Sequence, residues 1–122
     1  MFTSMQYLIW FLSVVLVVTG SLLPARSPII HAVGMLPVSE KVLHFCIYTW
    51  LALLSLIIVR RRPLALLAAF AMALLGVTLE FGQKLVPGRA FEPRDMCINS
   101  LGVLTGVMLG ILASRIYPVR TH

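Results

Sequence analysis

The chain has 122 residues, of which 60% are hydrophobic and 11% are charged, and its mean hydropathy is +0.99. This composition excludes intrinsic disorder and an ordinary water-soluble globular enzyme, because a disordered chain has low hydrophobicity and a soluble enzyme needs more polar surface. The net charge of +6 does not indicate nucleic-acid binding, because the basic residues lie between apolar runs rather than on one face of a soluble fold.

The length limits how often such a chain can cross a membrane. Spanning roughly 30 Å of hydrocarbon takes about 20 helical residues, so the chain has room for at most four spans. Four apolar runs are present, at about residues 5–23, 40–59, 64–85 and 94–116. They predict an all-α fold, an integral membrane bundle of four transmembrane helices, with residues 1–122 forming a single domain.

Local signals delimit these elements. The first run lacks the basic start and the cleavage site of a signal peptide, so we expect a helix that is retained. The segment from Pro24 to Val38 contains three prolines and Gly34, and we expect it to form a loop without a helix. The later spans have start signals at Ser39, Pro63 and Pro93. Pro87 and Gly88 predict the turn between the last two spans.

The basic residues divide equally between the two ends of this bundle. One set is Arg60, Arg61, Arg62, Arg115 and Arg120, and the other is Arg26, Lys41, Lys84, Arg89 and Arg94. Four residues of the second set lie beside acidic residues in the sequence and are expected to be held in a site, whereas the first set is a dense tract without acids. We therefore expect the first set and both termini to be cytoplasmic.

All four acidic residues fall at the other end, together with three polar stripes at helical spacing. The acids are Glu40, Glu80, Glu92 and Asp95, and the stripes comprise Lys41, His44 and Tyr48, then Gly76, Glu80, Gln83 and Lys84, then Asp95 and Asn99. His44, Glu80 and Asn99 lie inside the apolar boundary, where such groups usually face a bundle interior and find partners. We predict a polar site there, with Lys41, His44 or Arg89 as partner of Glu80. The alternative is that these side chains only extend to the membrane interface and form no site, and this explanation suffices for Lys84 and Arg94.

This group of side chains could bind an anionic headgroup or act in general acid–base chemistry. A metal site built from Glu40, His44, Glu80 and Asp95 is conceivable, but no HxxxH or HExxH pattern supports it, so no metal and no cofactor is predicted. Cys46 and Cys97 lack the spacing of a redox or zinc motif, and we expect two buried thiols rather than a disulfide.

The last span also carries a stripe of small residues, Gly102, Gly106 and Gly110, which form two overlapping GxxxG repeats. Such a stripe lets a neighbouring backbone approach closely. Because the stripe continues the face of Asp95 and Asn99, we favour packing within the bundle over a homodimer contact. The oligomeric state itself stays open.

Three blocks of these residues together resemble the VanZ-like family of small bacterial membrane proteins. The blocks are Glu40, Lys41, His44, Phe45 and Tyr48; Glu80, Gln83, Pro87, Gly88 and Arg89; and Asp95, Asn99, Gly102 and Gly106. Glu40 stands where Asp is more usual, and Ala90 stands where Ser or Thr is common. The resemblance implies a four-helix membrane protein and a link to resistance to glycopeptide antibiotics such as teicoplanin, but it supplies no mechanism.

The leading hypothesis is a binding or remodelling protein of the bacterial cell envelope. It is placed in the cytoplasmic (inner) membrane, where its polar site engages a membrane lipid or a wall-precursor headgroup. The predicted binding residues are Lys41, His44, Tyr48, Glu80, Gln83, Arg89, Asp95 and Asn99. Arg89 and Lys41 would contact phosphate or carboxylate, and Glu80 and Asp95 would orient them. The rival hypotheses are a membrane enzyme with His44 or Glu80 as general base, and a structural subunit.

Overall fold

The computed structural model describes residues 2–24, 26–89 and 91–116, which form helices and no strand. The elements are α1 (Phe2–Leu22), α2 (Pro28–Gly34), α3 (Glu40–Ile58), α4 (Arg62–Gly82), the 3-10 helix η1 (Gln83–Leu85) and α5 (Pro93–Ile116). The predicted all-α class is confirmed. The predicted site residues all fall in the described part, whereas Arg120 of the basic tail and Ala90 lie outside it.

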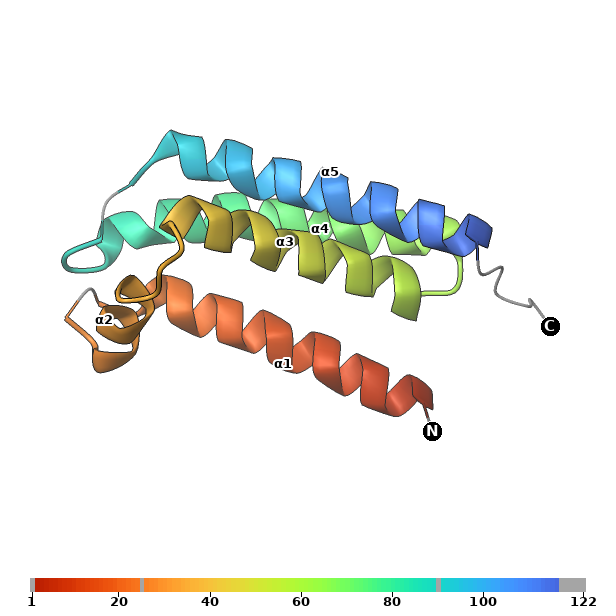
Figure 1. The fold of residues 1–122 in the computed structure, drawn as a ribbon, viewed down its shortest axis with the longest axis horizontal. Coiled ribbons are helices and arrows are strands. Elements are labelled where there is room, and N and C mark those ends of the chain that lie inside the picture. Colours follow the sequence, from red (N-terminus) through yellow and green to blue (C-terminus); the bar gives the residue numbers. More distant parts are fainter. Residues whose placement is uncertain (1, 25, 90, 117–122) are drawn as a thin grey trace.

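Four of these helical segments are long and apolar enough to cross a membrane, as the sequence predicts. They are Ser4–Leu22, Glu40–Ile58, Arg62–Leu85 and Pro93–Ile116. Figure 1 shows the N-terminal end of α1 and the C-terminal end of α5 at one end of the bundle, with α2 and the connection after η1 at the other. The described members of the two groups of basic residues therefore lie at opposite ends.

The expectation of a loop without a helix between Pro24 and Val38 is wrong, because α2 forms there. Ser27 caps its start, with its hydroxyl oxygen accepting a hydrogen bond from the Ile30 backbone N–H at 3.2 Å. Pro28 occupies the first turn, where a missing N–H costs nothing, so the prolines mark the boundaries of a short helix rather than preventing one. No residue of α2 is buried.

The core of the bundle forms where α5 packs against α3 along its glycine stripe. A methyl group on Gly102 would lie 2.6 Å from the Phe45 carbonyl oxygen, and one on Gly106 would collide with the Thr49 carbonyl oxygen. On Gly110 it would lie 2.6 Å from Leu56 Cβ. The expectation that this stripe packs within the bundle is thus confirmed, since all three glycines face the backbone or side chains of α3.

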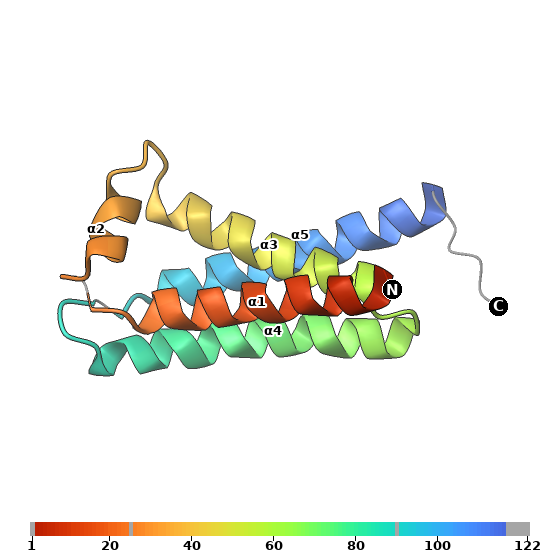
Figure 2. The same ribbon diagram turned by 90° about the horizontal axis from the view of Figure 1, so that it is seen from below.

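The helix α1 lies outside this three-helix core. None of the residues in its membrane span is buried, and it rests on α3 and α4 through partly buried side chains such as Trp10, Val14 and Val17 (Figure 2). Trp50 Nε1 of α3 donates to Ser13 Oγ of α1 at 3.2 Å. Most of the α1 surface is therefore available to lipid.

The expectation of two buried thiols is wrong. Cys46 of α3 and Cys97 of α5 are both exposed and unpaired. Each lies on the outer surface of its helix, because the inward face of both helices is taken up by the α3–α5 contact.

Candidate functional site

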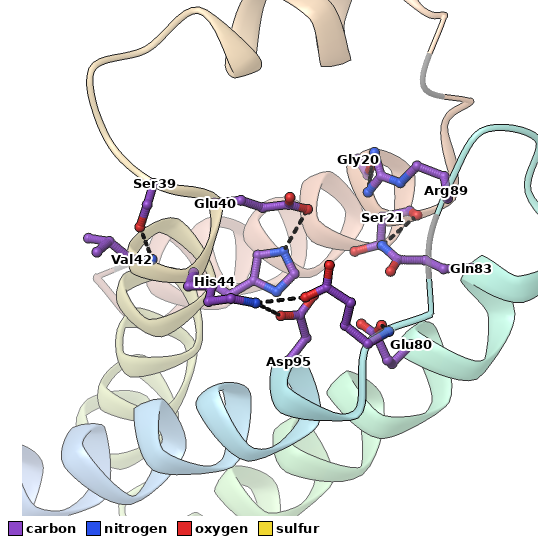
Figure 3. Close-up of polar contacts among 12 residues, drawn as sticks. Gly20, Ser21, Ser39, Glu40, Val42, His44, Glu80, Gln83, Arg89 and Asp95 are labelled. Carbon is purple, nitrogen blue, oxygen red and sulfur yellow. Dashed lines mark hydrogen bonds and ion pairs between the residues drawn. The ribbon is translucent and has the colours of Figure 1, made fainter.

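Polar side chains gather at the end of the bundle where α3 and α5 begin and α4 ends (Figure 3). Four of the predicted residues with polar or charged side chains are nearly fully buried there, with exposed fractions of 2% for Glu80 and Asn99, 4% for Gln83 and 5% for Asp95. Tyr48 is 3% exposed. Burial of this kind in an apolar bundle requires partners for each group, because an unpaired polar group costs about 1–3 kcal/mol.

Lys41 joins α3 to the start of α5. Its ammonium nitrogen lies 2.7 Å from Glu92 Oε2 and 3.2 Å from Asp95 Oδ1. The hydrogen bond from Lys41, reinforced by its positive charge, lowers the pKa of Glu92 below its ordinary value of 4.5. The predicted pairing of Lys41 with Asp95 is present, but two carboxylates already neutralise this cation, so it is a weak candidate for contact with an external anion.

His44 lies one turn further along α3 and faces Glu40. The distance from His44 Nε2 to Glu40 Oε1 is 3.7 Å, and the buried Nδ1 has no hydrogen-bond partner among the described residues. One ligand atom each from Glu40, His44 and Asp95 lie within 4.8 Å of one another. These three are the residues that could hold a metal ion, although the Lys41 ammonium group already contacts the Asp95 carboxylate.

Glu80 has a different partner from those that we predicted. Its Oε1 accepts a hydrogen bond from the backbone N–H of Glu92 at 2.7 Å, and no ion pair joins it to Lys41, His44 or Arg89 in the described chain. Glu92 is thus a site residue that sequence reasoning left out of the binding set. Its position directly before Pro93, at the start of α5 and three residues from Asp95, was the available signal.

Tyr48 and Asn99 meet α4 at a glycine. A methyl group on Gly76 would lie 3.0 Å from Tyr48 Cε1 and 3.1 Å from Asn99 Nδ2, so the absence of a side chain at Gly76 makes room for both. The Asn99 Oδ1 atom is buried and has no hydrogen-bond partner among the described residues. The predicted convergence of the three polar stripes is therefore present at this level of the bundle.

Gln83 and Arg89 point to the last turn of α1 rather than to the carboxylates (Figure 3). Gln83 Nε2 donates to the Ser21 carbonyl oxygen at 3.0 Å, and Arg89 Nη2 reaches the Gly20 carbonyl oxygen at 3.5 Å. The last carbonyls of a helix lack partners within the helix and carry partial negative charge, so these two donors cap α1. The sequence offers no local signal for this contact.

The other basic residues of this end are not paired with acids. We expected four of the five to be held beside acidic residues, but among the described residues only Lys41 forms such an ion pair. Lys84 instead lies over the rings of Phe81 and Phe91, with its ammonium nitrogen 5.1 Å and 4.2 Å from their centroids. Neighbours in sequence are thus separated in space here, because successive side chains on a helix point in different directions.

Comparison with protein families identifies the family of this chain. The model of the VanZ/LLP1 family matches residues 2–114, so the chain belongs to this family and is a VanZ-like multi-pass membrane protein. No match is found among curated proteins. None is found among solved structures.

Proposed function

We propose that this VanZ-like protein binds the headgroup of a lipid or of a lipid-linked wall precursor at its polar end. The observation that carries the proposal is the burial of Glu80, Gln83, Asp95 and Asn99 at one end of an apolar bundle. Ionisable and amide groups at such positions are costly, and they are usually retained for binding or catalysis.

The arrangement favours a headgroup over a molecule taken up from water. The site lies at the end of four helices that are long and apolar enough to cross a membrane, so a ligand anchored by acyl or polyprenyl chains would approach it from the bilayer. We place the protein in the bacterial inner membrane as part of the cell envelope, with this end outside the cytoplasm. The family resemblance supports a role in resistance to teicoplanin.

Glu80→Gln tests the proposal. Glutamine retains an oxygen that can accept from the Glu92 backbone N–H, so the bundle should fold while the negative charge is lost. A carboxylate accepts hydrogen bonds from headgroup hydroxyls, and loss of one such charge-assisted contact, worth on the order of 1–3 kcal/mol, would weaken headgroup binding roughly tenfold to a hundredfold. Binding of a lipid-linked wall precursor and of phosphatidylglycerol to the purified protein measures this, with teicoplanin susceptibility of expressing cells as a second readout.

The matched control is Thr78→Val on the same helix. Thr78 is exposed, and its hydroxyl donates only to the Leu74 carbonyl oxygen of its own helix. We expect this variant to bind like the parent protein. Equal binding by Glu80→Gln and Thr78→Val, at equal folded abundance, would rule out a headgroup site built on Glu80.

A membrane enzyme acting on the same class of ligand is the second candidate. It is favoured by the facing pair of His44 and Glu40, because a carboxylate beside an imidazole orients it and supports its action as a general base. Chemical change of the bound precursor by the parent protein, absent in His44→Gln, would establish the enzyme. Binding of the precursor without chemical change would support a protein that only binds the headgroup.

A further inference from the structure

A groove opens at the polar end between two connections of the chain. It has a volume of about 630 Å³ and is lined by Pro24, Arg26, Ser27, Pro87 and Gly88. One wall follows α1 and the other follows η1, so the groove lies beside the capped end of α1. No acidic residue lines it. Its size is in the range of ordinary ligand sites.

Backbone hydrogen bonds hold both walls. The Arg89 N–H donates to the Val86 carbonyl oxygen at 3.2 Å across Pro87 and Gly88, as in a type II turn. Gly88 has a φ of 76°, a conformation that glycine adopts without strain. In the opposite wall the Ser27 N–H donates to the Pro24 carbonyl oxygen at 3.0 Å. The groove is therefore formed before any ligand binds.

Its donors suit an anion. Arg26 is exposed in one wall, and Arg89 directly follows the Gly88 turn of the other. Within the described residues no carboxylate lies within 4.0 Å of either guanidinium group. The four acids of the chain instead contact Lys41, His44 and the Glu92 backbone N–H. Ser27 Oγ accepts from Ile30, which leaves its hydroxyl hydrogen to donate.

We propose that this groove binds the phosphate group of the ligand, with Arg26 and Arg89 as its charged contacts and the Ser27 hydroxyl as a further donor. The inference rests on the proposed function and deepens it, since it names the group recognised and moves the anion contact from Lys41 to the two arginines. A guanidinium group presents paired N–H donors that match phosphate oxygens. Arg89 follows the lining residue Gly88, and its bond to the Gly20 carbonyl oxygen is long, at 3.5 Å, and uses one nitrogen, so we assign its other guanidinium nitrogens to the phosphate.

The test measures lipid binding to the full chain in detergent. The probes are phosphatidylglycerol and diacylglycerol with the same acyl chains, which differ by the phosphate-bearing headgroup, and inorganic phosphate serves as competitor. Arg26→Gln is the main variant, because Arg26 is exposed and its side chain forms no ion pair with the other described residues. Arg60→Gln, an exposed arginine at the opposite end, is the control that changes net charge equally.

We expect the parent protein to prefer phosphatidylglycerol, and Arg26→Gln to lose about tenfold in affinity for it, as removal of one charged contact predicts. Arg60→Gln should bind like the parent. Competition by inorganic phosphate would show that free phosphate suffices, whereas its failure would show that the lipid headgroup is needed; both support a phosphate site.

Equal affinity in Arg26→Gln and Arg60→Gln would overturn the groove assignment, as would equal binding of the two lipids by the parent. If binding then still depended on Glu80, the proposed headgroup function would stand without this groove. If the parent bound neither of the lipids nor the wall precursor, the proposed function would fail as well.

Discussion

Glu92 connects three helices at the polar end through two different groups. Its backbone N–H donates to Glu80 of α4, and its carboxylate accepts from Lys41 of α3, while Glu92 itself leads directly into α5. A residue in a connection thus fixes the relative positions of α3, α4 and α5. The buried Glu80 carboxylate is satisfied by a backbone donor, so the chain does not need an internal cation for it.

The pairing of Glu92 predicts a pH dependence. Lys41 lowers the pKa of Glu92 in the folded protein below 4.5, so this pair stabilises the fold above that pH and is lost as the pH falls through the folded value. We expect Glu92→Gln to lower the unfolding temperature near pH 7, and the gap to the parent protein to close as the pH falls below 4.5. Thermal unfolding in detergent at several pH values measures this. A gap that does not change with pH would contradict an ionic role for Glu92.

The contact of α5 with α3 determines how closely the bundle packs. Gly106 faces the backbone of α3, and a methyl group there would lie 2.7 Å from Ala52 Cβ and 3.0 Å from Leu53 N. In contrast, nothing lies within 4 Å of a methyl group on Gly20 of α1. The same substitution therefore has opposite expected effects on two membrane helices.

We expect Gly106→Ala to destabilise the bundle by about 1–3 kcal/mol, the usual cost of overpacking a core. Gly20→Ala should be neutral or stabilising, by at most about 1 kcal/mol, because alanine favours the helix. Unfolding of both variants in a graded series of denaturing detergent measures the difference. Equal stability of the two would mean that the glycine stripe does not determine the α3–α5 distance.

Local signals predicted those parts of the fold that local chemistry determines. The Ser39 cap of α3, the turn at Pro87 and Gly88 and the glycine stripe each depend on residues close in sequence, and each was recognised. The helix α2 was missed because prolines were taken as breaks rather than as boundaries.

Contacts between distant residues were harder to predict. The convergence of the polar stripes followed from helical spacing, but the partner of Glu80 and the capping of α1 by Gln83 depend on the paths of two connections. No periodicity in the sequence encodes those paths. For the same reason the expectation that four basic residues of this end are held with neighbouring acids fails within the described residues, where only Lys41 forms such an ion pair.

At the scale of the whole molecule, charge is distributed asymmetrically. All four acids of the chain lie at the polar end, and the opposite end carries Arg60, Arg61, Arg62 and Arg115. Arg62 Nη2 also donates to Ser114 Oγ at 2.9 Å, which ties the start of α4 to the end of α5. Only Val59, Arg60 and Arg61 separate α3 from α4, so this basic tract is confined to the membrane surface.

This confinement predicts the orientation of the protein, with the connection around Arg61 in the cytoplasm and the Gly88 turn outside it. Each arginine near an anionic cytoplasmic surface contributes about 1 kcal/mol, and three of them are adjacent at this short connection, whereas the basic residues of the polar end are spread over several segments. A fluorescent reporter inserted after Arg61 should be active, and a secreted phosphatase inserted after Gly88 should be active. Replacing Arg60, Arg61 and Arg62 by glutamine should reduce both signals, whereas the same change at Arg26, Lys84 and Arg94 should not. The reverse pattern of reporter activity would place the polar end in the cytoplasm, and the headgroup that it binds would then belong to the inner leaflet.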